Sequence, residues 1–389
     1  MGSGSRAAIV RAALPALAYY YTVGSFGFWL PLYLKSLGWE YRLVTWAASA
    51  YFLALTPSTL AAGLLADLTG RPGTLVCLGL LANAVGIEGV VAFHGSPALV
   101  YAFRALQGVG LATALPIALG SLSLLAGVRR GVSITALTSS LGMAVGSLAG
   151  GAILPALGFP WLVHSAALLS VAAAAASCRW RPPARLPGGR GVLGRLREVP
   201  LGVYIVALAL VLRNAFASGV FSVLAVVFNM VFGVSILWTS IALAANPLAE
   251  FAATPLASRV SRGREALVYS LAIMGTSLVF YLYLHASTAP GVLGAQVLLG
   301  VVYIHIMVAG NNYILSRTPE EIRYTASSIY SLSFNLGWII GTLVAGPYMD
   351  AHGPRAWIRL AAIGCVAAGL LALAAGLTDR RPGRGPRGA

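Results

Sequence analysis

The fold of this chain is decided by the stretch Gly63-Leu-Leu-Ala-Asp67-Leu-Thr-Gly70-Arg71, which stands between two long apolar segments. One apolar run ends near Ala66 and the next begins at Gly73. Glycine tolerates the backbone conformations that a tight reversal needs. A charged reversal between apolar runs predicts a turn at a membrane surface, although an ordinary solvated turn would show the same local pattern.

The composition is that of a membrane protein. The 389 residues are 58% hydrophobic and only 9% charged. A helix needs roughly 20 apolar residues to cross the hydrocarbon core, and backbone groups in lipid must be satisfied within the segment, which favours helices. Cys77, Cys178 and Cys365 lie singly inside apolar runs, so their spacing predicts neither a disulfide nor a metal site. No cofactor is expected.

We predict an all-α membrane protein with twelve transmembrane helices in two six-helix repeats. The predicted spans are 12–34, 43–66, 73–94, 97–121, 131–157, 160–178, 202–231, 235–257, 266–286, 290–315, 324–350 and 357–377. A Pro-, Gly- and Arg-rich stretch interrupts the pattern in the middle and indicates a linker. The predicted units are therefore a six-helix bundle at 1–178, a basic cytoplasmic linker at 179–200, and a second bundle with a short basic tail at 201–389.

A shift of 195 residues supports the duplication. The pairs that it superposes are Gly24 with Gly219, Phe26 with Phe221, Gly38 with Gly233, Leu141 with Leu336, Gly142 with Gly337, Gly146 with Gly341, Gly151 with Gly346 and Gly158 with Gly353. A shift of about 191 residues aligns Asp67 with Ser258 and Gly70 with Ser261 in the sequence. The hinge is therefore expected to have decayed in the second repeat.

Basic residues divide unevenly between the two sides of this arrangement. Of the 26 Lys and Arg residues, 20 fall on the side that holds both termini, 4 on the other side, and Arg104 and Arg213 within spans. Basic residues stay on the cytoplasmic side, so both termini are predicted to be cytoplasmic in a multi-pass protein of the cell membrane. The net charge of +16 indicates this topology and attraction to anionic lipid of the bilayer, not nucleic acid.

The hinge resembles the loop between the second and third helices of the major facilitator superfamily, whose pattern is Gly-x-x-x-Asp-x-x-Gly-Arg-Arg/Lys. Gly63, Asp67, Gly70 and Arg71 match it, whereas Pro72 stands in place of a further basic residue. The segment 97–121 carries Arg104-Ala-Leu-Gln107-Gly108-Val-Gly110, which is similar to the family's Arg-x-x-Gln-Gly-x-Gly. The resemblance covers essentially the whole chain.

A glycine pattern in segment 131–157 points to one branch of that family. Gly142, Gly146, Gly150 and Gly151 resemble the motif of the drug:proton antiporters, except that Ser147 replaces the usual proline. Small residues at every fourth position also let helices approach closely in lipid, whatever is transported. Antiport and plain close packing both remain open.

The resemblance implies alternating access, in which two bundles rock about a site at the membrane midplane. In family members the hinge acid lies near the cytoplasmic start of the eleventh helix, which falls here at Tyr324–Thr325. Helix-end amides favour a negative charge. We therefore expect Asp67 to act as a latch that holds the bundles together while the outside is open.

Four ionisable residues are expected inside the membrane, where they are costly and usually functional. They are Glu88, Arg104, Arg213 and Glu250. Equal distance from the turn at 95–96 predicts that Glu88 pairs with Arg104, and similar depth predicts that Arg213 lies near Glu250. Glu250 is the expected proton carrier; the alternative is a static ion pair in each repeat.

Aromatic and polar residues inside the spans are candidates for lining a substrate cavity. Single aromatics more often pack or sit at the membrane interface, whereas amides need partners when buried. The candidates are Tyr20, Tyr21, Phe28, Gln107, Asn214, Asn246, Tyr303, His305, Asn311, Asn312, Tyr330 and Asn335.

These features predict a secondary active transporter that is not an enzyme, because no nucleophile, acid–base set or metal cluster gathers near one interface. Its predicted partners are a small-molecule substrate, protons and the lipid bilayer, and it is expected to be a monomer. Proton-coupled efflux of amphipathic compounds is the first interpretation. The alternatives are uptake or facilitated transport of a sugar or organic acid, and a non-transporting receptor or scaffold.

Overall fold

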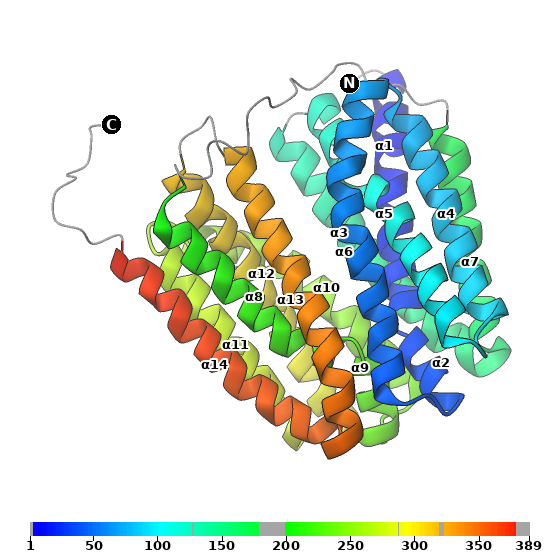
Figure 1. Cartoon of the computed structure of the whole chain (residues 1–389). Coiled ribbons are helices and arrows are strands. Elements are labelled where there is room, and N and C mark those ends of the chain that lie inside the picture. The colour runs from blue at the N-terminus through cyan, green and yellow to red at the C-terminus, as the bar shows by residue number, and fades with distance from the viewer. Residues whose placement is uncertain (1–2, 127, 179–198, 287, 319–322, 379–389) are drawn as a thin grey trace.

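The computed structural model describes residues 3–126, 128–178, 199–286, 288–318 and 323–378. Within these ranges every regular element is a helix, and turns join the helices (Figure 1). The N half, up to residue 178, contains α1 (Ser3–Thr22), η1 (Val23–Gly27), α2 (Leu30–Ser36), α3 (Tyr41–Thr69), α4 (Pro72–Ala92), α5 (Pro97–Ala126), α6 (Val128–Leu157) and α7 (Phe159–Ser177). The C half, from residue 199, contains α8 (Leu201–Phe221), α9 (Leu224–Val226), η3 (Val227–Val231), α10 (Ile236–Val260), α11 (Glu265–His285), α12 (Ala289–Arg317), α13 (Arg323–His352) and α14 (Pro354–Thr378).

Eleven of the described helices are long and apolar enough to cross a membrane. The chain is therefore an all-helical membrane protein. The first predicted span is not among the eleven. The π-helical segment η1 and a short turn divide it into α1 and α2. In η1 the N–H of Phe28 donates to the carbonyl of Val23 at 3.1 Å, the five-residue spacing of a π-helix. The predicted span 202–231 is divided in a similar way by the turn before α9 and by η3.

The turns between helices fall at two ends of the molecule. We call the outer end the one that holds the α2–α3 and α13–α14 turns, and the inner end the one that holds the α3–α4 and α10–α11 turns. Glycines with positive φ mark equivalent turns in the two halves: Gly38 and Gly233 at 86° and 70°, Gly158 and Gly353 at 85° and 81°, and Gly70 and Gly263 at 61° and 68°.

The last of these pairs corrects the predicted register of the hinge. Gly70 stands two residues before the start of α4, and Gly263 stands two residues before the start of α11. Gly263, not Ser261, is therefore the counterpart of Gly70, and the turn glycine is retained in the C half. Only glycine adopts this left-handed backbone without strain. The alignment missed it because loop lengths shift the register by two residues.

The halves meet along α3 with α13 and along α6 with α10. Figure 1 shows α3 and α13 converging towards the outer end. One buried apolar cluster at that end draws on both halves and includes Trp29 and Phe228. Towards the inner end the apolar core consists of two separate clusters, one within the C half and one within the N half. The described part of the chain is therefore closed at the outer end.

Glycines allow α6 and α13 to pack closely in matching ways. A side chain at Gly142 or Gly146 would collide with the α1 backbone, and one at Gly337 or Gly341 would collide with α8. One turn or more further along each helix, another glycine faces the opposite half: Gly151 lies against Ser240 of α10, and Gly346 against Arg42 and Thr45 of α3. Close helix approach is thus one role of the glycine pattern.

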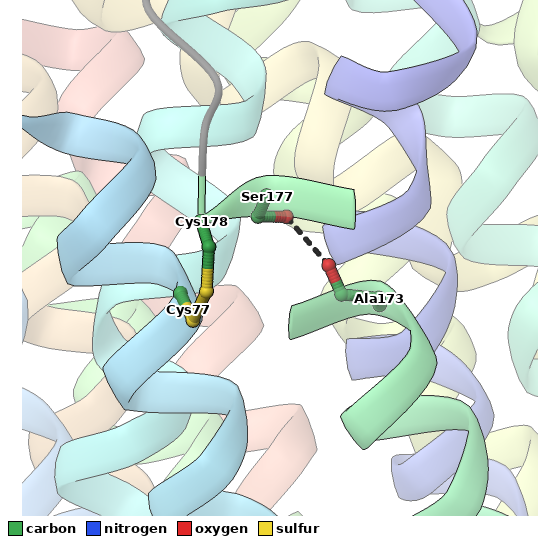
Figure 2. Close-up of a disulfide and its surroundings, with 4 residues drawn as sticks. All are labelled: Cys77, Ala173, Ser177 and Cys178. Carbon is green, nitrogen blue, oxygen red and sulfur yellow. Dashed lines mark hydrogen bonds between the residues drawn. A yellow bond between two sulfur atoms is a disulfide. The ribbon is translucent and has the colours of Figure 1, made fainter. Parts of the chain in front are cut away.

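A disulfide joins Cys77 of α4 to Cys178 at the end of α7, with Cα atoms 5.0 Å apart (Figure 2). The prediction that the cysteines stay unpaired was therefore wrong for these two. Because α4 and α7 pack side by side in opposite directions, the start of one meets the end of the other. A separation of 101 residues gives no sign of this proximity. Cys365 is a free, buried thiol.

Candidate functional site

Arg104 of α5 is buried against the helices of its own half. Its Nε donates to the carbonyl of Ala47 at 3.2 Å, and its Nη1 donates to Oε1 of Gln107. The guanidinium also lies over the rings of Tyr51 and Phe26, at 4.7 and 5.4 Å from their centroids. Aromatic faces and carbonyl oxygens therefore stabilise this cation in place of a carboxylate. The two rings are partners that depth along the helices did not reveal.

The expected ion pair between Glu88 and Arg104 is not formed. Glu88 lies on another face of α4, where its Oε1 is 2.8 Å from Nδ1 of His164 on α7. Both side chains are substantially exposed, at 36% for Glu88 and 50% for His164. Equal depth gave the wrong partner because it carries no information about the direction in which a helix face points.

Arg213 of α8 is almost completely buried, at 1% exposure. Its Nη1 donates to Oδ1 of Asn214 at 2.8 Å, and its Nη2 donates to Oγ1 of Thr276 on α11 at 3.3 Å. The guanidinium lies 5.8 Å from the ring centroid of Tyr303. Arg213 forms no direct ion pair with Glu250, although the two are within electrostatic range of each other.

Glu250 sits where α10 crosses α12 and is half-buried. With its amide oriented so that both groups have partners, Asn246 donates to Glu250 Oε1 at 2.9 Å and accepts from the N–H of Gly300 at 3.1 Å. A side chain at Gly300 would collide with the carbonyl of Asn246 and approach the N atom of Glu250 to 3.0 Å. Pro247 lies one position after Asn246 and has no N–H to donate. The carboxylate is thus positioned by a side-chain amide and by a very close helix crossing.

Three of the predicted cavity residues interact with this carboxylate, one by a hydrogen bond and two by longer-range electrostatics. Tyr20 of α1 lies within electrostatic range of both Glu250 and Tyr303, and Tyr303 of α12 lies within range of Glu250. Asn246 contacts Glu250 directly. Tyr20 belongs to the N half, whereas Asn246, Glu250 and Tyr303 belong to the C half, so this group spans the boundary between the halves. The proton affinity of Glu250 depends there on its burial and on the charge of Arg213.

Most of the other cavity candidates make hydrogen bonds within their own half. Tyr21 bonds Ser165, Gln107 accepts from Arg104, Asn214 donates to the carbonyl of Phe334, Asn312 donates to Ser261, and Tyr330 donates to the carbonyl of Ile306. His305 and Asn311 bond carbonyls of α12 itself, Phe28 packs against the outer apolar cluster, and Asn335 is half-buried on α13. Groups of the protein thus provide hydrogen-bond partners for the amides of Gln107, Asn214, Asn311 and Asn312 without a substrate.

The side-chain contacts of the predicted inner latch are not described. The backbone at Gly63, Asp67, Tyr324 and Thr325 is helical, but the surroundings of these residues lie outside the description. Gly70 caps α3 with φ at 61°, and Arg71 is exposed. Most of the predicted linker, residues 179–198, is also outside the description.

The helical arrangement and the sequence can now be compared with known proteins. The family model for the Major Facilitator Superfamily matches residues 13–342, with a second match at 204–389. The chain belongs to this superfamily. Its family and fold are those of membrane transporters.

Related proteins agree with this membership. The chain is 35% identical over 135 residues to the uncharacterized MFS-type transporter Rv1250 of Mycobacterium tuberculosis, a match over 34% of this chain and 23% of that relative's length. A variant of the nucleoside transporter NupG has a similar structure, with a TM-score of 0.80 at 14% identity over 96% of this chain and 100% of that one. A bacterial homologue of the human lysosomal transporter Spinster, in an inward-facing and occupied conformation, gives a TM-score of 0.76 at 14% identity, covering 97% and 98% of the two chains.

Proposed function

We propose that this superfamily member is a proton-coupled antiporter that exports amphipathic, drug-like small molecules by alternating access. In this proposal α1, η1 and α2 together form a first span, and α8, α9 and η3 form another. The twelve spans then make two six-helix repeats joined by the linker at 179–200. The protein lies in the cell membrane as a monomer with both termini in the cytoplasm, as the distribution of basic residues indicates.

The position of Glu250 is the observation that carries the proposal. It is an acid at the boundary between the halves, within electrostatic range of Tyr20 from one half and of Arg213 and Tyr303 from the other. A rocking motion of the halves changes which of these groups lie near it and whether water reaches it. A carboxyl in such a place can take up a proton in one conformation and release it in the other.

The distribution of apolar contacts supports alternating access. The core is shared between the halves at the outer end and divided at the inner end, which is the arrangement of an inward-facing transporter. In the opposite state Asp67, with Gly63, Gly70 and Arg71, closes the inner end against the start of α13. A helix N-terminus stabilises a carboxylate by about 0.3–1 kcal/mol at an exposed site.

Transport in proteoliposomes with Glu250→Gln tests the proposal. The amide mimics the protonated acid permanently, so substrate exchange should continue while accumulation driven by a pH gradient should disappear. The matched control is Glu88→Gln, which neutralises an acid in a span but far from the boundary between the halves, and should keep gradient-driven transport.

Other outcomes would contradict the proposal in specific ways. If Glu88→Gln abolishes coupling and Glu250→Gln does not, the proton carrier is misassigned. If the wild type exchanges substrate without responding to a pH gradient, facilitated transport of a small organic solute replaces antiport. If no member of a broad substrate panel is exchanged, a receptor or scaffold becomes the better interpretation.

A further inference from the structure

The carboxylate of Asp350 crosses from the C half to the N half at the outer end. Asp350 lies close to the end of α13, and its Oδ1 and Oδ2 accept hydrogen bonds from the backbone N–H groups of Tyr41 and Arg42 at 2.7 and 2.9 Å. These two residues are the first two of α3. The first N–H groups of a helix have no partner within the helix, and the helix dipole favours a negative charge there.

The α3 helix does not provide this cap itself. Its own N-cap residue, Glu40, makes no side-chain capping hydrogen bond. The Glu40 carboxylate instead pairs with the Arg42 side chain at 2.5 Å. The C half therefore supplies the missing cap of an N-half helix.

Uncharged contacts continue the same boundary between α3 and α13. Trp46 Nε1 donates to the carbonyl of Leu343 at 3.1 Å, and the hydroxyls of Ser49 and Thr342 lie 2.6 Å apart. The close approach of Gly346 to α3 allows these bonds to form. Among these contacts between α3 and α13, the hydrogen bonds of Asp350 are the ones that involve a formal charge. A surface pocket of about 400 Å³, lined by Asp350 together with Glu40 and Arg42, gives water a route to the contact.

The positions of two acids along α3 and α13 are reciprocal. The helices pack along each other in opposite directions, so the end of one lies level with the start of the other. Asp67 follows the first residue of α3 by 26 positions, and Asp350 follows the first residue of α13 by 27 positions. Each helix thus carries an acid near the end that lies beside the start of its antiparallel partner.

We propose that Asp350 is the outer latch of the transport cycle: it caps α3 while the outer end is closed and releases it when that end opens. The inference rests on the alternating access of the proposed function and adds a gate residue to it. Asp67 then plays the reciprocal part at the inner end. Because the halves rock as rigid bodies, closing one cap separates the other, and the two carboxylates stabilise opposite states.

Distance measurements across the outer end test the latch. In a variant with the three native cysteines changed to serine, spin labels are placed at Gly95 and Pro290, exposed positions at outer turns of the N and C halves. Distances are recorded by double electron–electron resonance in liposomes, without substrate or pH gradient. Asp350→Asn should raise the ratio of the long outer distance to the short one by about tenfold, as expected for the loss of one hydrogen bond to a charged group.

Control variants separate the cap from its surroundings. Glu40→Gln removes a carboxylate that lines the same pocket without bridging the halves, and should leave the ratio unchanged. Asp350→Ser, which keeps a small acceptor but no charge, provides the same test if the asparagine variant does not insert. Adding Asp67→Asn to Asp350→Asn should return the ratio towards the wild-type value.

An unchanged outer distance in both Asp350 variants, or an equal shift with Glu40→Gln, would refute the latch. Because these measurements use no gradient, such a result would leave proton coupling through Glu250 untouched. Conversely, if transport proved not to be coupled to protons, the expected spin-label distances at the outer end would stay the same.

Discussion

The crossing of α10 and α12 at Gly300 allows a sharp prediction, because the same helix offers a matched control. An alanine Cβ at Gly300 would collide with the carbonyl of Asn246 and lie 2.9 Å from the Cβ of Ala249 and 3.0 Å from the N atom of Glu250. These neighbours are mostly backbone, which cannot rotate away. At Gly294, almost two turns earlier in α12, an added Cβ meets nothing within 4 Å.

The magnitude follows from comparing the two substitutions. Glycine to alanine inside a helix stabilises it by about 0.5–1 kcal/mol, and this gain applies to both variants. Gly300→Ala alone adds overpacking, which typically costs about 1–3 kcal/mol. The helix propensity cancels in the difference, so Gly300→Ala should be less stable than Gly294→Ala by about 1–3 kcal/mol.

Equilibrium unfolding of purified protein in mixed detergent micelles measures this difference. The proton-driven transport of Gly300→Ala should also fall, because moving α12 away from α10 displaces the hydrogen bond between Asn246 and Glu250. Gly294→Ala should transport normally. Equal stability and equal transport in the two variants would refute the close crossing and its role in positioning Glu250.

Two further predictions concern the acids Glu88 and Asp67. Glu88→Gln should lower the free energy of unfolding by less than about 1 kcal/mol, because the glutamine side chain can keep a hydrogen bond to His164; a loss of several kcal/mol in detergent unfolding would instead indicate that the charge of Glu88 is required. Asp67→Asn should insert and fold normally but lose most of its transport, with more inward-open protein in spin-label distances across the inner end. Undiminished transport would mean that the stretch from Gly63 to Arg71 is only a turn.

The sequence by itself was enough to predict the class of fold. Long apolar runs broken by charged, glycine-bearing turns leave helices as the way to satisfy the backbone in lipid. The hinge at Gly63–Arg71 and the motif at Arg104 indicated the superfamily, which the family match confirmed. Glycines at a constant shift, such as Gly146 and Gly341, indicated equivalent positions, and both face the first long helix of their own half in the structure.

Depth along a helix could be estimated from the sequence, but direction around the helix could not. Glu88 and Arg104 lie at similar depth, yet one faces His164 and the other faces Tyr51. Glu250 and Arg213 interact electrostatically, but the hydrogen bonds of Arg213 go to Asn214 and Thr276. A rotation of about 100° per residue changes the partner of a side chain completely while its depth changes by only 1.5 Å.

Contacts between segments far apart in the chain were decided only by the tertiary structure. The spacing of Cys77 and Cys178 predicted no disulfide, and their pairing depends on the antiparallel packing of α4 and α7. Asp350 lies so near a helix end that its sequence position suggests a solvated side chain, and only the meeting of α13 with the start of α3 gives it a role. Local sequence determines which segments become helices through hydrogen bonding and burial within each segment, whereas the partner of each helix end is set by how the two halves pack together.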